Sequence, residues 1–251
     1  MIYFLIVLFC IWLISFWFQN DLTIRLKNCN GFRKILIIYP HPDDEVLTCG
    51  GLIKSSQKSI ITVLTKGEAG ENYLNDNSNL KVLRTQEMQR SAKILGANKL
   101  INLDLGDGEL TKKKLKIIIE VKKIIEFEKP DLVITYDLAG LYGHPDHVVL
   151  SEVITELRKK YEYALWYSTF PRKVLKMVKL PDHMANDKRY KNMRVHPTLK
   201  IFIGLSVFDK IKALYAHKSQ YNSFRNAYPF KFIPLWVFVL GTIFEYFYEV
   251  K

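Results

Sequence analysis

Two short cassettes, PHPDDE and GHPDH, hold the residues with the clearest chemical potential in this sequence. Each cassette has two potential metal ligands three residues apart: His41 and Asp44 in the first, His144 and His147 in the second. Because a spacing of three places side chains on one face of a helical turn, each pair can present its ligands together. Two such turns meeting at one sheet edge would form a metal site.

The surroundings of the cassettes favour a metal site over two ordinary turns. His, Pro and Asp are common where helices begin, so a single HPD triplet would indicate only a loop. Here, however, both cassettes follow apolar strand-like runs, 35–39 and 132–136, and they contain three of the six histidines of the chain. A metal site therefore explains the pattern better than coincidence.

Zinc is the metal that these ligand types favour. A catalytic zinc commonly has three imidazole or carboxylate ligands and keeps a fourth position for water or substrate. The metal lowers the pKa of the bound water, and a neighbouring carboxylate can take its proton. We therefore expect zinc, with another divalent metal as the alternative.

With the TKGEAGE segment (65–71) between them, the cassettes resemble those of the PIG-L (LmbE-like) zinc-dependent de-N-acetylases. This family removes acetyl groups from compounds that contain N-acetylglucosamine. The resemblance runs from about residue 34 to about residue 220 and includes several separated motifs in the family's order.

The resemblance implies a role for each residue of the cassettes. His41, Asp44 and His147 would hold zinc, Asp43 would be the general base, and His144 would stabilise the oxyanion or protonate the leaving amine. Asp43 does not share a helical face with the two ligands beside it, so its side chain is free to lean toward the water.

Four further residues are candidates. By resemblance, Arg84, Asp107 and Tyr142 would contact the substrate, although a solvated helix face for Arg84 and simple packing for Tyr142 are the alternatives. Asp146 is either a carboxylate that orients a neighbouring imidazole or a charge at a helix start, and the sequence does not separate these two interpretations.

The pattern of apolar residues predicts an α/β fold: a three-layer, doubly wound, mostly parallel sheet of Rossmann-like type. In such sheets ligands bind at the carboxyl ends of the strands, where both cassettes would lie. The expected strands are 34–39, 59–65, 99–105, 131–136 and 163–168, and the expected helices begin near Glu45, Leu80, Thr111 and Pro145.

The chain is expected to contain a deacetylase domain over residues 30–225, preceded by an N-terminal transmembrane anchor over 1–20. Residues 1–18 carry no charge and would span roughly 27 Å as a helix, near the thickness of the hydrocarbon core. Basic residues follow this segment, so the positive-inside rule predicts a single-pass membrane protein with its catalytic domain on the cytoplasmic side.

The last segment, 230–251, is apolar and aromatic but too short to predict a second span. We expect it in the membrane interface, with Trp236, Phe238, Tyr246 and Tyr248 at headgroup depth, and a core helix is the alternative.

The net charge of +12 comes from dispersed lysines, which excludes a nucleic-acid platform and fits attraction to anionic lipid. The three cysteines show no disulfide framework. Nothing in the sequence indicates an oligomeric state.

The sequence as a whole predicts a zinc-dependent amide hydrolase that removes the N-acetyl group from an N-acetylglucosaminyl compound, lipid-linked or linked to phosphoinositol. The alternatives are a deacetylase of a soluble N-acetylglucosaminide of the thiol-precursor type, a non-catalytic membrane-bound protein that binds a sugar lipid, and an esterase or phosphoesterase. The lack of a second carboxylate-rich cassette disfavours two-metal phosphoryl chemistry.

Overall fold

A central sheet organises the protein, as seen in a computed structural model that describes residues 2–74, 79–227 and 233–251. Its eight described strands follow the order β1-β7-β8-β6-β5-β2-β3-β4. All five predicted strands are present, and β1, β7 and β8 are additional. The strands are β1 (Arg25–Lys27), β2 (Ile35–Tyr39), β3 (Ser59–Val63), β4 (Lys99–Asn102), β5 (Leu132–Tyr136), β6 (Ala164–Thr169), β7 (Leu199–Phe202) and β8 (Phe244–Val250).

The sheet is mostly parallel, as predicted. Strand β2 pairs in parallel with both β3 and β5, and the parallel arrangement continues through β6 on one side and β4 on the other. Strand β8 is the exception, because it lies antiparallel between β6 and β7.

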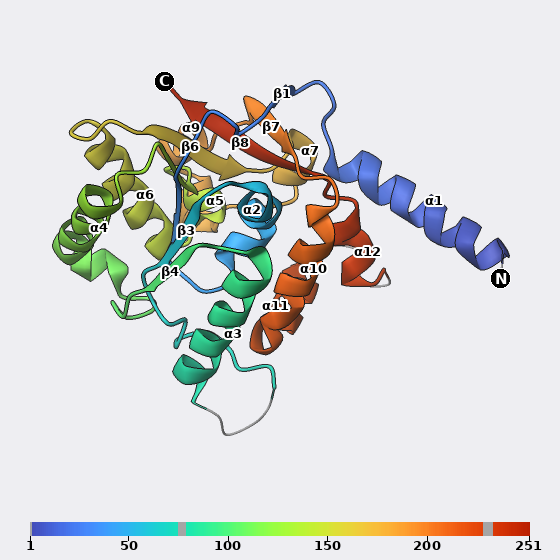
Figure 1. The fold of residues 1–251 in the computed structure, drawn as a ribbon, viewed down its shortest axis with the longest axis horizontal. Helices are drawn as coiled ribbons and strands as arrows, with labels where there is room; N and C mark the ends of the chain where they lie inside the picture. Colours follow the sequence, from blue (N-terminus) through green and yellow to red (C-terminus); the bar gives the residue numbers. More distant parts are fainter. Residues whose placement is uncertain (1, 75–78, 228–232) are drawn as a thin grey trace.

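Helices cover both faces of the sheet (Figure 1). The four predicted long helices begin within a few residues of their expected positions. The helices of the domain are α2 (Asp44–Ser55), α3 (Leu80–Leu95), α4 (Lys114–Glu128) after the 3-10 turn η1 (Leu110–Lys113), α5 (Gly140–Gly143), α6 (Pro145–Arg158), α10 (Ser206–Ala216), η2 (Lys218–Gln220), α11 (Tyr221–Ala227) and α12 (Leu235–Leu240).

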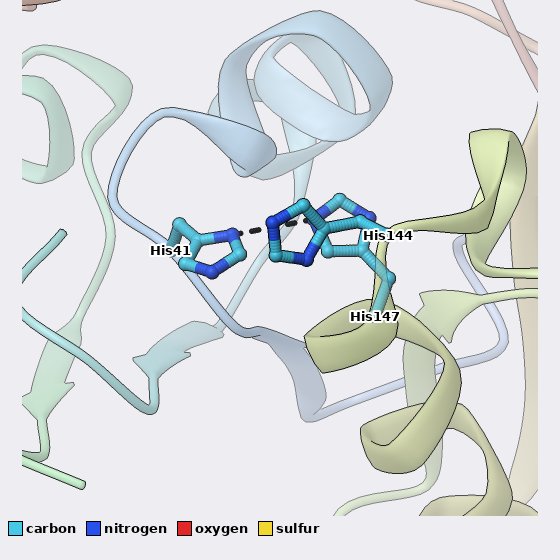
Figure 2. A group of neighbouring side chains, drawn as sticks. All are labelled: His41, His144 and His147. Carbon is cyan, nitrogen blue, oxygen red and sulfur yellow. Dashed lines mark hydrogen bonds between the residues drawn. The ribbon is translucent and has the colours of Figure 1, made fainter. Parts of the chain in front are cut away.

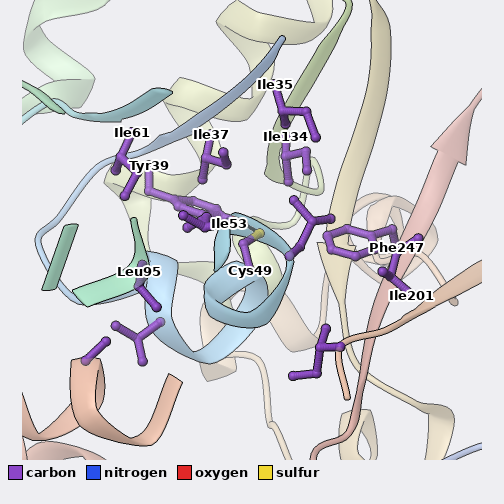
Figure 3. Packing of buried hydrophobic residues seen from close by; sticks show 14 of the residues in the cluster. Ile35, Ile37, Tyr39, Cys49, Ile53, Ile61, Leu95, Ile134, Ile201 and Phe247 are labelled. Atoms are coloured by element: carbon purple, nitrogen blue, oxygen red, sulfur yellow. Dashed lines mark hydrogen bonds between the residues drawn. The ribbon is translucent and has the colours of Figure 1, made fainter. Parts of the chain in front are cut away.

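Strand β2 shows how the sheet divides the core into two layers. Ile35 and Ile37 point to the face covered by α2, α3, α10 and α12, and Figure 3 shows part of this cluster. Leu36 and Ile38 point to the opposite face, where they join the apolar sides of α4 and α6. Because successive side chains of a strand alternate between faces, a strand buried on both sides is apolar throughout.

The segment 171–197 contains three short helices, α7 (Arg172–Leu175), α8 (Asp182–Ala185) and α9 (Lys188–Met193). It packs near the second cassette, because a Cβ on Gly143 would overlap Pro181 and Met184.

The predicted N-terminal helix exists, but its predicted role is corrected. Helix α1 (Ile2–Gln19) leaves the domain at the right of Figure 1, and its last turns pack on α12. There Gln19 donates to the carbonyl oxygen of Phe238 at 2.8 Å, and Asn20 donates to that of Gly241 at 2.8 Å. Among residues 2–74, 79–227 and 233–251, no helix combines the length and the apolar character that a membrane crossing requires. The single-pass topology with a cytoplasmic catalytic domain is therefore wrong.

The position expected for the last segment is also corrected. Residues 230–232 lie outside the described residues, but Phe244–Val250 form β8 inside the sheet, so Tyr246 and Tyr248 do not lie at headgroup depth. Tyr246 and Phe247 are buried. Tyr246 and Tyr248 belong instead to a strand with neighbours on both sides, and Trp236 and Phe238 lie on helix α12.

A buried ion pair fixes β8 to helix α2. Glu245 accepts hydrogen bonds from the backbone N–H groups of Gly51 and Leu52, both at 2.8 Å. Lys210 of α10 lies 2.8 Å from the same carboxylate, and both side chains are at most 2% exposed. Because neither charge is in contact with water, each depends on the opposite charge to offset the free-energy cost of its burial.

We expect Lys210→Met to lower the free energy of unfolding by about 3–5 kcal/mol, since the variant leaves Glu245 buried without its cation. Urea unfolding measures this loss. The control is Lys123→Met, which removes the exposed Lys123–Glu120 pair and is expected to cost less than about 1 kcal/mol. Equal losses in the two variants would contradict this account of the buried pair.

Candidate metal centre and its surroundings

The two cassettes meet at the carboxyl edge of adjacent parallel strands. The first follows β2 and leads into α2, and the second follows β5 and leads through α5 into α6. Figure 2 shows the outcome: His41 comes from one side, and His144 and His147 come from the other, with their rings facing a common space.

Three predicted ligands come within a few ångströms of one another. His41 Nδ1 lies 3.3 Å from His147 Nε2 and 3.5 Å from Asp44 Oδ2. Asp44 Oδ1 lies 3.6 Å from His147 Nε2. Ligands held at 2.0–2.2 Å around a tetrahedral zinc are about 3.3–3.6 Å apart, so this spacing and these donor types fit zinc.

Two other groups of residues have donor atoms close enough to hold a metal ion. One consists of His41, His144 and His147, and the other of His41, Asp107 and Asp146. All three sets share His41. The nitrogen of His41 that faces the metal separates the set with Asp107 and Asp146, on Nε2, from the set with Asp44 and His147, on Nδ1.

The far side of the His41 ring lies against two carboxylates. Nε2 lies 3.0 Å from Asp107 Oδ1 and 3.3 Å from Asp146 Oδ2. Burial disfavours the charged imidazolium, but Asp107, Asp146 and Asp44 outweigh burial and raise the pKa of His41 well above its usual value. Carboxylates on the outer nitrogen of a ligand histidine fix its tautomer and orient its ring, which favours Nδ1 as the nitrogen that faces a metal.

Asp146 and Asp107 are both anchored by backbone groups. Asp146 accepts from the N–H groups of Gly108 and Leu110, and Asp107 accepts from that of Ala69. The structure thus places Asp146 beside an imidazole and also in the first turn of α6. Asp107, expected at the substrate, has a side chain that is only 8% exposed.

A tyrosine that the sequence analysis missed supports two of the ligands. Tyr136, the last residue of β5, donates from its hydroxyl to Asp44 Oδ1 at 2.9 Å. Its ring stacks on His147 with centroids 4.5 Å apart. Its position at the end of the strand that leads to the second cassette was a usable signal, but a tyrosine at a strand end is more often a packing residue.

Asp43 has an unusual backbone conformation. Its φ of 103° lies in the region that favours glycine, and it is one of three non-glycine residues with positive φ in the described chain. Although it occupies the N-cap of α2, its side chain makes no capping hydrogen bond. Its carboxylate instead lies 2.9 Å from Arg84 Nη2. Burial raises the pKa of Asp43 to about 6, against the opposing effect of Arg84.

Arg84 lies behind Asp43 and is only 4% exposed. Besides Asp43, it donates to the carbonyl oxygens of Pro42 at 2.6 Å and Gly67 at 2.8 Å. A Cβ on Gly67 would overlap the guanidinium, which explains why the loop after β3 has glycine there. The sequence predicted that Arg84 contacts the substrate. In the structure its guanidinium instead donates hydrogen bonds to groups of the protein itself.

His144 sits at the N-cap of α6, followed by Pro145 at the first helical position. Its Nδ1 accepts a hydrogen bond from the Asp146 N–H at 3.2 Å, which assigns the ring proton to Nε2. Burial and the nearby His41 lower the pKa of His144, so the neutral form is favoured. Tyr142, two residues earlier, is 39% exposed and packs edge-on against His147.

Beneath Asp43 lies a second layer of polar residues that the sequence analysis did not assign to the site. Glu45 accepts from the Asp43 N–H at 3.0 Å, from Ser91 at 2.7 Å and from His217 at 3.0 Å. The residues around His217 do not by themselves place it beside the first cassette. Only the three-dimensional fold brings residues from α2, α3 and the end of α10 together.

Comparison with known proteins agrees with this arrangement. A family model described as PIG-L, GlcNAc-PI de-N-acetylase, matches residues 36–157. The diacetylchitobiose deacetylase of Thermococcus kodakarensis is 39% identical over 124 residues, 47% of this chain and 46% of that protein. The 1D-myo-inositol 2-acetamido-2-deoxy-alpha-D-glucopyranoside deacetylase of Corynebacterium glutamicum is 29% identical over 171 residues, 56% of this chain and 58% of that protein. The aligned parts thus cover about half the length of these relatives.

A solved structure extends the similarity to most of the fold. The N,N'-diacetylchitobiose deacetylase from Pyrococcus horikoshii superposes with a TM-score of 0.64 over 87% of this chain and 84% of that one, at 22% identity. The match to the family model contains both cassettes and the loop between them. Over residues 36–157 the chain therefore matches the PIG-L (LmbE-like) family.

Proposed function

We propose that this protein is a zinc-dependent deacetylase that hydrolyses the N-acetyl group of a soluble N-acetylglucosaminide. The proposal rests on the distances of 3.3–3.6 Å between the side-chain donor atoms of His41, Asp44 and His147. Two groups suited to proton transfer lie beside them. A zinc ion held there would supply Lewis-acid polarisation of the acetyl carbonyl and would lower the pKa of a bound water.

Asp43 has the properties of the general base. With its pKa at about 6, the carboxylate is ionised at neutral pH and is a stronger base than an ordinary aspartate. Arg84 holds one carboxylate oxygen, Oδ2, and leaves the other for the attacking water.

His144 has the properties of the second proton-transfer group. Its neutral ring carries the proton on Nε2, which can donate to the developing oxyanion or to the departing nitrogen. In the reaction water adds to the acetyl carbon and the C–N bond breaks. The proton that Asp43 takes from water ends on the amine, and acetate and a free glucosamine amine are released.

Two of the deacetylases similar to this chain are named for a chitobiose and for an inositol glucosaminide, and this supports a soluble sugar as the substrate. No described helix could cross a membrane, so the earlier reason for preferring a lipid-linked substrate is removed. Among the residues expected to touch substrate, Tyr142 is the one whose side chain is substantially exposed beside the site, and we assign it that role.

The ligand set can be tested by metal content. We expect His41→Ala, Asp44→Ala and His147→Ala each to lower zinc affinity by at least about 10-fold, because each removes a direct ligand. His144→Ala is expected to retain zinc, and His183→Ala, which removes an exposed histidine of α8, serves as the control. Plasma emission spectrometry after dialysis measures the bound metal. Loss of zinc from His144→Ala but not from Asp44→Ala would identify the three-histidine set instead.

The base can be tested by turnover. Asp43→Asn preserves the size of the side chain but cannot accept the proton, so we expect zinc content to be unchanged and kcat to fall by about 10²–10⁴-fold. Acetate release under saturating zinc measures this. Full activity of Asp43→Asn would show that another group activates the water.

The substrate class can be tested with a panel at equal concentrations. We expect amine release from diacetylchitobiose or from an N-acetylglucosaminyl inositol or malate to exceed that from N-acetylglucosaminyl-phosphatidylinositol in detergent. A preference for the phosphatidylinositol compound would restore the lipid-linked alternative. Binding without any acetate release, by protein with full zinc occupancy, would favour a non-catalytic sugar-binding role.

A further inference from the structure

The conformation of Asp43 requires an explanation that the metal site does not provide. A φ of 103° at a non-glycine residue costs on the order of 1–3 kcal/mol and persists only where the surroundings enforce it. The side chain of Asp43 does not cap α2, so it does not stabilise its own backbone. The enforcing contacts must come from elsewhere.

Glu45 provides one such contact from within the same turn. Its Oε2 accepts the Asp43 N–H at 3.0 Å, a hydrogen bond that forms only when this N–H points back into the turn. The Glu45 side chain is fully buried. A buried carboxylate needs partners on its other oxygen, and here the partners come from two distant parts of the chain.

Ser91 and His217 are these partners. Ser91 of α3 donates to Glu45 Oε1 at 2.7 Å, and His217 Nε2 lies 3.0 Å from the same oxygen. Both side chains are fully buried, and Glu45 raises the pKa of His217 against the effect of burial. Because the carboxylate can only accept, the ring proton of His217 lies on Nε2.

We propose that Ser91 and His217, acting through Glu45, are positioning residues that hold the backbone of Asp43 in its strained conformation and so aim the carboxylate of the base. We call the three residues Glu45, Ser91 and His217 the Asp43 clamp. The inference rests on the proposed function for the role of Asp43. It assigns a catalytic purpose to His217, which lies outside the residues matched by the family model.

Arg84 completes the support from the opposite side. It binds the Pro42 carbonyl oxygen and the Asp43 carboxylate, which are on either side of the N–H that Glu45 holds. The Pro42 carbonyl oxygen and the Asp43 N–H belong to one peptide group, so Arg84 and Glu45 hold its two ends and fix the orientation of its plane. A base held this way needs no reorganisation when substrate arrives, and small misplacements of such groups are costly to rate.

Two variants remove the outer members of the clamp, Ser91 and His217, and each is compared with a second variant. Ser91→Ala removes one hydrogen bond to Glu45. Ser219→Ala is its control, because Ser219 is equally buried and donates to a different carboxylate, Glu87, at 2.6 Å. His217→Leu removes the imidazole, and His217→Gln restores an N–H donor at the position of Nε2.

We expect kcat to fall by about 10-fold or more in His217→Leu and by a smaller factor in Ser91→Ala, with KM changed less than about 2-fold and zinc content unchanged. His217→Gln should recover much of the loss, and Ser219→Ala should retain the activity of the unmodified protein. If His217→Leu fails to fold, Ser91→Ala against Ser219→Ala still decides the question.

A second measurement does not depend on turnover. Hydrogen–deuterium exchange of the peptide containing residues 40–46 includes the Asp43 N–H, and it should quicken in Ser91→Ala and His217→Leu but not in Ser219→Ala. Unchanged exchange and unchanged kcat in both clamp variants would overturn the inference. If the unmodified protein releases no acetate from any compound while exchange still responds, the proposed function fails and the clamp stands as a structural device only.

Discussion

The parallel pairing of β2 with β5 is the constraint on which the site depends. Ile35, Leu36 and Ile37 lie opposite Leu132, Val133 and Ile134, so the two strands end at the same level of the sheet. The two cassettes are far apart in the sequence, so no local structure fixes the distances between the metal ligands that they supply. The hydrogen bonds between β2 and β5 fix these distances. A shift of one residue in the pairing of the two strands would move a cassette by about 3.3 Å and turn its side chains to the other face.

Around that edge the protein surrounds every ionisable group of the site with partners. His41 has carboxylates on both sides of its ring, Asp44 has a tyrosine, and Asp43 has an arginine. Their surroundings shift the pKa values of three neighbouring groups in different directions: carboxylates raise the pKa of His41 against the effect of burial, burial lowers that of His147 to about 3, and burial raises that of Asp43 to about 6. In the proposed site, where His41 and His147 hold the metal, Asp43 is the group of these three that can exchange a proton near neutral pH.

The sequence was informative where chemistry follows from local order and uninformative where it follows from distant contacts. The cassettes, the strands that precede them and the four long helices could be predicted, because periodicity and helix-start residues are encoded within a few positions. His217 and Ser91 could not, since a buried histidine and a buried serine acquire their meaning only from Glu45, which the fold brings to them. Arg84 belongs to the same class: its position was noticed, but its partners, Pro42 and Gly67, are set by tertiary packing.

The terminal segments gave wrong predictions for a related reason. An apolar aromatic stretch looks alike whether it faces lipid or other strands, and the pairing of β8 with β6 and β7 is not visible in its own residues.

The position of β8 has a consequence for how the protein acquires its shape. This strand is the last of the eight in the chain, yet it lies in the interior of the sheet and joins the pair β1–β7 to the strands that carry the cassettes. During synthesis, a chain that has emerged only as far as β7 would hold two separate sheet fragments, each with an unpaired edge. The sheet becomes continuous only when Phe244–Val250 are available, and Glu245 then connects to the helix that begins with Asp44. Assembly of the edge that carries the cassettes is in this way coupled to completion of the sheet, so a chain that has been made as far as β7 is expected to be exposed to misassociation until β8 is available.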